Sequence, residues 1–256
     1  MDIKYSGGNV MSLGTNLQYL RKQKKITQEQ LAETMNVSRQ TVSRWESDEV
    51  IPELQKLIEL STIFSCKLDG LVKEDLASYD GIYSEIKILK VAAFKMARYV
   101  IVSPNPEDDV NEYMNRWARN AGLLTVFPDA KLIGWDFPFV SPEMQNRFGL
   151  RGYVAAYIIP EGFETEYPGV EYAEQAEAEY AMVTIFNPFE QAFERIPNAY
   201  KRIMEYLQAN NFKEKPRDHV LSCFEHVYNK EGVTCMDVYI HVDGVTKTDA
   251  FTIFNK

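Results

Sequence analysis

The stretch TQEQLAETMNVSRQTVSRWE, residues 27–46, carries two short helical patterns with a turn between them. Apolar side chains that are three and four residues apart lie on one face of a helix. The apolar positions with this spacing are Leu31, Ala32, Met35, Val42 and Trp45. The stretch therefore predicts a helix, a turn of three to four residues and a second helix, which is the helix-turn-helix layout.

Both predicted helices begin at a residue suited to capping. Thr27 followed by Gln30 fits a capping box, in which two side chains satisfy two backbone N–H groups reciprocally. Ser38 precedes the second helix, and serine is a favoured N-cap residue. Similar spacings continue on both sides of the stretch and give four helical segments in all, through Leu13, Leu17, Leu20, Leu54, Leu57, Ile58 and Leu60.

The segments TQEQLA and VSRQTVSRWE closely resemble the phage-repressor-like (XRE) helix-turn-helix family, and the resemblance spans about residues 12–72. It implies five short helices, with the second helix of the motif in the major groove of DNA. On this chain it implies that Arg39, Gln40 and Arg44 face base edges, since Arg can bridge two guanine acceptors and Gln can pair with adenine. The predicted DNA-contacting set is Gln28, Ser38, Arg39, Gln40, Thr41, Ser43 and Arg44. The alternative is that these side chains only form a solvated helix face.

Charge is unevenly distributed along the chain, whose formal net charge is -9. Residues 12–46 carry six basic and three acidic side chains, whereas residues 76–256 carry 18 basic and 26 acidic ones. Only the first stretch has the charge to meet a phosphate backbone. We expect double-stranded operator DNA as a partner, bound by a homodimer that reads two half-sites about one helical turn apart.

The composition is that of an ordinary soluble protein, with 256 residues of which 45% are hydrophobic and 25% charged. This length favours two domains. No apolar run is long enough to span a membrane and no signal peptide is recognisable, so the sequence predicts a cytoplasmic protein without a membrane partner. Three scattered cysteines and three histidines show no spacing typical of a metal site, and no cofactor is predicted.

Four regions are predicted from these patterns: a disordered N-terminus over residues 1–11, the helical domain over 12–72, a linker over 73–86 and a further domain over 87–256. In the last region, 87–103 is read as one long or bent strand, and the helical pattern that starts at Pro106 is followed by two strands. A strand, a helix from about Pro197 and two strands then repeat this order. The acidic segment between the repeats, about residues 160–179, is read as a loop with a short helical turn. The fold class predicted is an all-α domain followed by a duplicated β-α-β-β domain, with an antiparallel sheet and helices on one face.

The element order and the segments ARYVIV, PEG, YAMVTI, FE and DVYIHV resemble the GyrI-like (AraC effector-binding) domain from residue 87 to about residue 242. The sequence departs from that family at Asn187 and Pro188, where a glycine is common. The resemblance implies a groove between the repeats for drug-like or cationic molecules, with an acidic residue in the late FE strand as the partner of positive charge. The matching position is Glu225.

Glu225 poses a question of its own, because LSCFEHVYN, residues 221–229, reads as a strand in which Leu221, Cys223 and Val227 share its face. A carboxylate in apolar surroundings needs a partner, water or a proton. The partner is either an external cation or an ion pair with Arg98 or Arg151. The aromatic residues predicted to line a binding groove with Glu225 are Trp135, Phe137, Tyr153, Tyr157, Tyr180 and Tyr239. Tyr153 and Tyr157 share a strand face, as do Trp135 and Phe137, so the two pairs are predicted to line the groove. The alternative, which is favoured for each ring taken alone, is plain core.

The sequence thus predicts a transcriptional regulator that binds DNA through its helix-turn-helix and senses a small-molecule effector in its C-terminal domain. Two alternatives remain at this level. The C-terminal domain sequesters a compound or docks a protein without regulation, or it hydrolyses a reactive molecule with Glu225 and Tyr157 activating water. No nucleophile, base and orienting residue form a recognisable set, so the prediction is a protein that is not an enzyme.

Overall fold

The computed structural model describes residues 13–74, 76, 81–212, 217–243 and 252–253. The predicted disordered N-terminus lies outside the described residues, and so does part of the predicted linker. The chain divides into two compact units, one of residues 1–85 with 204–211 and the other of residues 86–203 with 212–256. None of the described helices is both long and apolar enough to cross a membrane.

The described residues of the first unit up to Lys73 fold into five helices, as the resemblance implied. These are α1 (Leu13–Gln23), α2 (Gln28–Met35), α3 (Arg39–Glu46), α4 (Leu54–Ile63) and α5 (Leu68–Lys73). Their apolar faces meet in one cluster that includes Leu17, Leu31, Ala32, Met35, Val42, Trp45, Leu60, Phe64 and Leu71. The spacing of apolar residues therefore identified the buried faces of α2 and α3 correctly. In α4 it did so only in part, because Leu60 is buried but Leu54 and Ile58 are exposed.

Local signals set the ends of α2 and α3. The capping box at Thr27 and Gln30 is present, and the Ser38 side chain caps α3 by accepting from the backbone N–H of Thr41. Asn36 ends α2 in the left-handed conformation, with φ 51°. Gly14 is required where α1 meets the end of α3, because a Cβ there would lie 2.6 Å from the carbonyl oxygen of Glu46.

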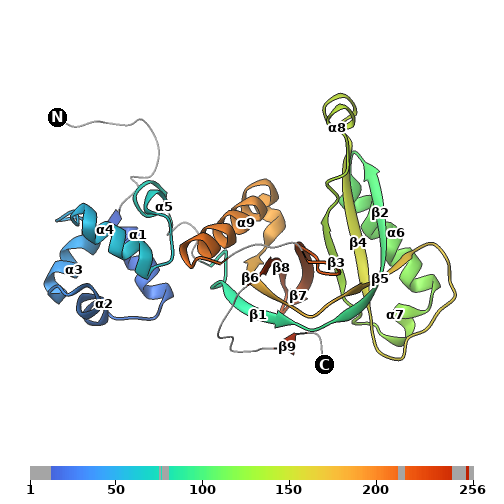
Figure 1. The fold of residues 1–256 in the computed structure, drawn as a ribbon, viewed down its shortest axis with the longest axis horizontal. Coiled ribbons are helices and arrows are strands. Elements are labelled where there is room, and N and C mark those ends of the chain that lie inside the picture. The colour runs from blue at the N-terminus through green and yellow to red at the C-terminus, as the bar shows by residue number, and fades with distance from the viewer. Residues whose placement is uncertain (1–12, 75, 77–80, 213–216, 244–251, 254–256) are drawn as a thin grey trace. The chain divides into compact units, whose positions relative to one another are not determined.

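The second unit is built on a nine-stranded sheet in the described residues, with the order β5-β2-β4-β3-β7-β8-β6-β1-β9 (Figure 1). The strands are β1 (Lys87–Val91), β2 (Phe94–Ser103), β3 (Leu132–Asp136), β4 (Arg151–Ile159), β5 (Glu171–Gln175), β6 (Ala178–Phe186), β7 (Cys223–Lys230), β8 (Val233–Val242) and β9 (Thr252–Ile253). The helices are α6 (Pro106–Asn120), α7 (Leu123–Val126), α8 (Pro142–Phe148) and the part of α9 (Ala192–Ala209) up to Ile203, with the 3-10 helix η2 (Pro188–Gln191) before α9.

The sheet has the predicted duplication. The first repeat is β2, α6, β3 and β4, and the second is β6, α9, β7 and β8. Their strands lie in the order β2-β4-β3 and β7-β8-β6, which are mirrored about the antiparallel pair that β3 and β7 form. The fold class, an α+β domain after an all-α domain, is therefore confirmed.

Three local expectations were wrong. The predicted single strand over residues 87–103 is two strands, and β1 pairs with β6 of the second repeat whereas β2 pairs with β4 of the first. The acidic segment between the repeats contains β5, which pairs with β2. Helix α9 begins at Ala192 rather than near Pro197, because η2 leads directly into it and the buried face formed by Ala199 and Ile203 compensates for a proline inside the helix.

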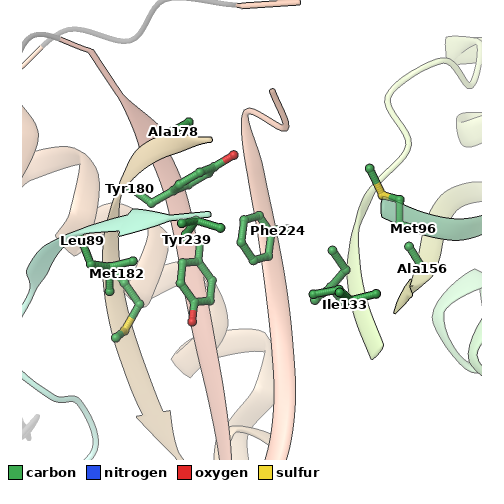
Figure 2. Close-up of a cluster of buried hydrophobic side chains, with 11 residues drawn as sticks. Leu89, Met96, Ile133, Ala156, Ala178, Tyr180, Met182, Phe224 and Tyr239 are labelled. Atoms are coloured by element: carbon green, nitrogen blue, oxygen red, sulfur yellow. The ribbon is translucent and has the colours of Figure 1, made fainter. Parts of the chain in front are cut away.

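The two faces of the sheet bury different sets of side chains. We call the face toward α6 the helix face, and there Tyr153, Ala155 and Tyr157 of β4 pack with Val110 and Met114 of α6. Side chains alternate along a strand, so Ala156 and Ile158 lie on the opposite face. The cluster on that opposite face includes Met96, Ile133, Ala156, Tyr180, Met182, Phe224 and Tyr239 (Figure 2).

Candidate functional site

Helix α3 presents the predicted base-reading side chains to solvent. Arg39, Gln40 and Arg44 are exposed, whereas Val42 and Trp45 on the other side of the helix are buried. Exposed guanidinium and amide groups on one short helix suit major-groove recognition. The Arg44 guanidinium lies 3.5 Å from a carboxylate oxygen of Glu49, and both side chains are more than half exposed, so this ion pair is weak and does not hold Arg44.

The remaining predicted DNA contacts have roles within the domain as well. The hydroxyls of Ser38 and Thr41 are hydrogen-bonded to each other at 2.9 Å in the cap of α3. Ser43 is exposed, and Gln28 is half-buried. The Gln28 amide donates to Glu46 at 3.0 Å, so its side chain is fixed at the start of α2.

Glu46 connects three helices in the DNA-binding unit. Its carboxylate accepts from Nε of Arg21 at 2.6 Å and from Nη2 of Arg21 at 3.0 Å, in addition to the Gln28 amide. The Glu46 side chain is only 3% exposed. A bidentate, nearly buried pair of this kind orients α1, α2 and α3 relative to one another. Arg21 is therefore a structural residue.

The second candidate site is centred on Glu225 of β7, on the helix face of the sheet. The Tyr153 hydroxyl donates to Glu225 Oε2 at 2.9 Å, and the Tyr200 hydroxyl donates to Glu225 Oε1 at 2.8 Å. Tyr153 belongs to β4 of the first repeat, and Tyr200 belongs to α9 of the second. The site therefore lies where the two repeats meet, and each repeat contributes one hydroxyl to the same carboxylate.

A glycine allows the first repeat to reach this carboxylate. Gly134 of β3 is directly opposite Glu225 in the sheet, and the Tyr153 ring lies over it. A Cβ at Gly134 would lie 2.5 Å from the Tyr153 ring. Tyr153 thus crosses the width of β3 to reach β7, which only a residue without a side chain permits.

Burial and neighbouring acidic side chains oppose the charged form of Glu225, whereas its two hydroxyl donors support it. Burial raises the pKa of Glu225, the hydrogen bonds from Tyr200 and Tyr153 oppose this rise, and the charges of Asp136 and Glu107 add to it. Burial and the charge of Glu225 raise the pKa of both Tyr200 and Tyr153, which keeps their hydroxyls protonated as donors. Asp136 is opposite Tyr153 on β3, and Glu107 lies in the first turn of α6.

The ion-pair explanation for Glu225 was wrong. Arg98 pairs with Glu171 at 3.4 Å, and Arg151 donates to the carbonyl oxygen of Pro104 at 3.4 Å. Within the described part of the chain, Glu225 takes part in no ion pair. Its partners are two neutral hydroxyls.

The structure separates the predicted aromatic residues into two groups. Tyr153 and Tyr157 are on the helix face with Glu225, although the Tyr157 hydroxyl donates to Asn115 of α6 at 2.7 Å and not to the carboxylate. Trp135 is adjacent in sequence to Gly134 and therefore points to the opposite face. The predicted groove shared by the Tyr153–Tyr157 and Trp135–Phe137 pairs is therefore not formed, because a sheet lies between them.

The other three aromatic residues also lie away from Glu225. The Phe137 side chain covers Gly152, which is next to Tyr153 in β4 and so faces the opposite side. Tyr180 and Tyr239 are buried in the cluster on the opposite face, where the Tyr239 ring stacks on Phe224 with centroids 4.4 Å apart (Figure 2). These positions are core contacts in this structure.

A second carboxylate, which sequence reasoning missed, is buried on the opposite face. Asp237 of β8 accepts from the hydroxyls of Thr184 at 2.6 Å, Tyr228 at 3.2 Å and Tyr239 at 3.4 Å. It is directly opposite His226, the neighbour of Glu225 in β7. Burial raises the pKa of Asp237. Asp237 and Glu225 are therefore two hydroxyl-bound carboxylates on opposite faces of adjacent strands.

Comparison with known proteins supports the assignment of the first unit. Residues 17–71 match the family model described as helix-turn-helix. The chain is 44% identical over 62 residues to the HTH-type transcriptional activator BcrR of Enterococcus faecalis. This match covers 24% of this chain and 30% of BcrR. The chain is also 33% identical over 75 residues to Repressor protein C2 of Salmonella phage P22. That match covers 29% of this chain and 35% of the repressor. The N-terminal domain is thus a helix-turn-helix domain of the XRE type, and the chain spans about a third of the length of these curated relatives.

Among solved structures, the chain is similar to SAV2435 bound to tetraphenylphosphonium. The two are 10% identical with a TM-score of 0.39, and the match covers 62% of this chain and 94% of SAV2435.

Proposed function

We propose that this chain is a transcriptional regulator that binds DNA through α3 and senses a lipophilic cation at Glu225. The DNA-binding half rests on the helix-turn-helix match and on three exposed side chains of α3, Arg39, Gln40 and Arg44. One curated relative is named as a transcriptional activator and the other as a repressor.

The observation that carries the sensing half is the coordination of Glu225 by two neutral donors. Tyr153 and Tyr200 stabilise the carboxylate by hydrogen bonds but leave its charge uncompensated. Asp136 and Glu107 add further negative charge nearby. A half-buried anion that has no counter-ion among the described residues attracts a cation that replaces part of its lost hydration.

The chemistry of the neighbouring side chains narrows the ligand class. Tyr153 and Tyr200 present aromatic rings next to the carboxylate, and a ring face adds about 0.5–2 kcal/mol of attraction for a well-placed cation. A delocalised or aryl-substituted cation gains from both contacts, whereas a small hydrated ion gains mainly from the charge. We therefore assign a lipophilic organic cation as the ligand.

The test uses tetraphenylphosphonium as the probe, because it is a lipophilic aromatic cation. Isothermal titration of the full chain with wild type and with Glu225→Gln measures the contribution of the carboxylate charge at nearly constant shape. We expect Glu225→Gln to weaken binding by about tenfold or more, which corresponds to about 1.4 kcal/mol. The matched control is Asp237→Asn, which removes the hydroxyl-bound carboxylate of the opposite face and leaves the affinity near that of wild type. Equal affinity of wild type and Glu225→Gln contradicts the proposal.

Regulation requires more than binding. A ligand shifts an equilibrium only by the difference between its affinities for two states, so operator affinity must differ between the free and the cation-bound protein. A gel-shift titration with and without the cation measures this difference. Operator affinity that is unchanged by a bound cation supports the alternative in which the C-terminal domain only sequesters the compound.

The hydrolytic alternative needs Glu225 and Tyr157 to activate water together. The Tyr157 hydroxyl donates to Asn115 rather than to Glu225, so the two residues do not form this pair.

A further inference from the structure

Strand β2 is longer than the strand that covers its outer side. Residues Phe94–Arg98 pair with β5 on one side and, from Lys95 onward, with β4 on the other. Residues 99–103 continue along β4 but, in the part of the chain that the structure describes, have no strand on their other side. Figure 1 shows β2 extending beside β4 toward α8, beyond β5.

The outer edge of β2 is open because the segment that leads into β5 is held on α6 and does not run along β2. The carbonyl of Gly169 accepts from the Tyr113 hydroxyl at 2.6 Å, and the carbonyl of Tyr167 accepts from Nε1 of Trp117 at 3.4 Å. Both donors belong to α6. Gly169 has φ 103°, a backbone conformation that favours glycine. The chain turns there toward Glu171, which pairs with Arg98 of β2. The segment before β5 is thus held on α6. Among the described residues, no strand pairs with the outer edge of β2 from Tyr99 onward, and the Tyr99 ring stacks on Tyr113.

The open segment lacks charge and proline, two of the features that protect a sheet edge. Its sequence, YVIVS, contains no charge and no proline, and three of its five residues are β-branched. Tyr99 is 37% exposed, and Val100 and Val102 are each 38% exposed. Natural edge strands avoid self-association with charges, prolines or bulges. The outermost strand β5 follows this rule with Glu171 and Glu174, so the contrast is specific to residues 99–103.

We propose that residues 99–103 pair antiparallel with the same residues of a second copy of this chain, joining the two sheets into one. An edge that lacks charge and proline favours backbone pairing with an identical edge, because no like charges are brought opposite each other. Arg98 would be opposite Pro104 of the second copy, and Pro104 ends the pairing because it has no N–H group.

Symmetry restricts the register of this pairing. In an antiparallel pair, two residues directly opposite each other direct their backbone N–H and C=O groups either both toward the partner strand or both away from it. These two arrangements alternate along the strand. Opposite residues of two identical strands are therefore an even number of positions apart, and the two-fold axis passes at one residue. Placing the axis at Ile101 uses the whole segment, with Val100 opposite Val102 and Tyr99 opposite Ser103.

Apolar surface beside the strand end extends the proposed interface. Val102 is opposite Gly152, and the Phe137 side chain covers that glycine. The Phe137 ring contacts Phe139 with centroids 5.3 Å apart, and Phe139 is 82% exposed. Phe139 is thus an exposed aromatic ring at the same end of the sheet as the open segment.

The first experiment measures the oligomeric state of the full chain by sedimentation velocity over a range of concentrations. We expect wild type to form a dimer. For Val100→Lys we expect a dimer dissociation constant that is higher by about tenfold or more, because a lysine on an edge strand opposes pairing. The matched control is Val233→Lys, which places lysine at a valine of nearly equal exposure, 37%, at the start of β8. A monomeric wild type, or a Val100→Lys variant that dimerises as wild type does, overturns the proposal.

A cross-linking experiment decides the register without a destabilising charge. In the proposed dimer residue 101 faces itself, with Cβ atoms about 4.5–5.5 Å apart, which is close to the range for a disulfide. We expect Ile101→Cys to form a reducible covalent dimer under mild oxidation. Phe193→Cys, at a residue that is 95% exposed on α9, and wild type with its native cysteines serve as controls. A covalent dimer yield for Ile101→Cys no higher than for both controls contradicts the pairing.

Discussion

Tyr153 reaches across Gly134 to donate its hydroxyl to Glu225 at 2.9 Å, although the two residues are 72 positions apart in the chain. The contact joins the two repeats of the sheet, because Tyr153 lies on β4 and Glu225 on β7. It depends on the absence of a side chain at Gly134.

Gly134→Ala tests the crossing directly. The added methyl would lie 2.5 Å from the Tyr153 ring, so the ring must move away from Glu225. Overpacking of this kind costs about 1–3 kcal/mol of unfolding free energy, measurable by chemical denaturation, and we expect cation affinity to fall with it. Gly70→Ala is the control, because its Cβ would meet nothing closer than 3.9 Å. Equal stability and cation affinity for Gly134→Ala and wild type contradict the crossing.

The hydroxyl of Tyr200 is expected to support the charged form of Glu225. Tyr200→Phe removes one of two hydrogen bonds to the carboxylate, and hydrogen bonds to charged groups contribute about 1.5–3 kcal/mol. The pKa of Glu225 should rise further, as followed by NMR of the carboxyl carbon. Tyr157→Phe removes a hydroxyl that donates to Asn115 instead, so the pKa of Glu225 should stay as in wild type. An unchanged Glu225 pKa in Tyr200→Phe contradicts the assigned contact.

Cation affinity is expected to depend on pH through Glu225. Burial raises the pKa of this carboxyl above its ordinary value of 4.5, so its charge is lost at a higher pH than that of an exposed glutamate. Binding of tetraphenylphosphonium should be strongest above the raised pKa and weaken as pH falls through it. Glu225→Gln should bind weakly and without this pH dependence. A wild-type affinity that stays constant as pH falls through the range in which the Glu225 carboxyl protonates argues against the carboxylate as the cation partner.

The same shift predicts the direction of the stability change. A carboxyl whose pKa is raised on folding favours the folded state below the unfolded pKa, and this contribution is lost as pH rises through the folded pKa. Glu225→Gln should therefore be more stable than wild type at neutral pH, with the difference vanishing in acid. Urea denaturation at neutral pH and below pH 4.5 measures both ends of this range. Lower stability of Glu225→Gln at neutral pH contradicts the prediction.

Two substitutions separate sequence reading from general DNA contact. Arg44→Ala should cost about 1–3 kcal/mol of specific affinity and relax the preference at one base, whereas Gln28→Ala should weaken all sequences alike. A gel-shift series over operator variants distinguishes the two patterns. Arg147→Ala, which removes another exposed ion-paired arginine in the sheet unit, is the control. If Arg44→Ala and Gln28→Ala bind every DNA as wild type does, α3 is not the reading helix.

The Arg21–Glu46 pair is expected to hold the DNA-binding unit together. Glu46→Ala leaves the largely buried Arg21 guanidinium without its carboxylate, and breaking a buried pair costs about 3–5 kcal/mol. Loss of helical circular dichroism on heating measures this. Glu59→Ala removes the carboxylate of a more exposed pair with Lys56 and should change stability little. Equal losses in the two variants contradict a special role for Glu46.

The helix-turn-helix was readable from the sequence because its signals are local. Thr27 and Gln30 form their capping box within one helical turn, and Ser38 caps α3 through Thr41, three residues away. The buried residues of α2 and α3 follow directly from their spacing, since a helix face is set by a period of 3.6 residues. The same holds for the order of elements in the duplicated sheet, where each strand and helix has its own pattern.

The sheet pairing was not readable to the same degree. β1 and β2 are separated by two residues, yet they belong to different parts of the sheet, because β1 pairs with β6 and β2 with β4. β5 has the sequence EYAEQ, whose charges resemble those of a loop. As an edge strand it is held by backbone hydrogen bonds, which do not require apolar side chains.

The sequence by itself determined that a carboxylate lies in an apolar strand at position 225 and that such a group needs a partner. Only the tertiary structure decided which partners it has. Strand alternation placed Tyr153 and Glu225 each on one face of its own strand, but the order β4-β3-β7 brought them to the same face of one sheet, and α9 supplied Tyr200. The physical reason is that side-chain periodicity is a property of a short segment, whereas strand order and register arise from contacts between residues distant in the chain.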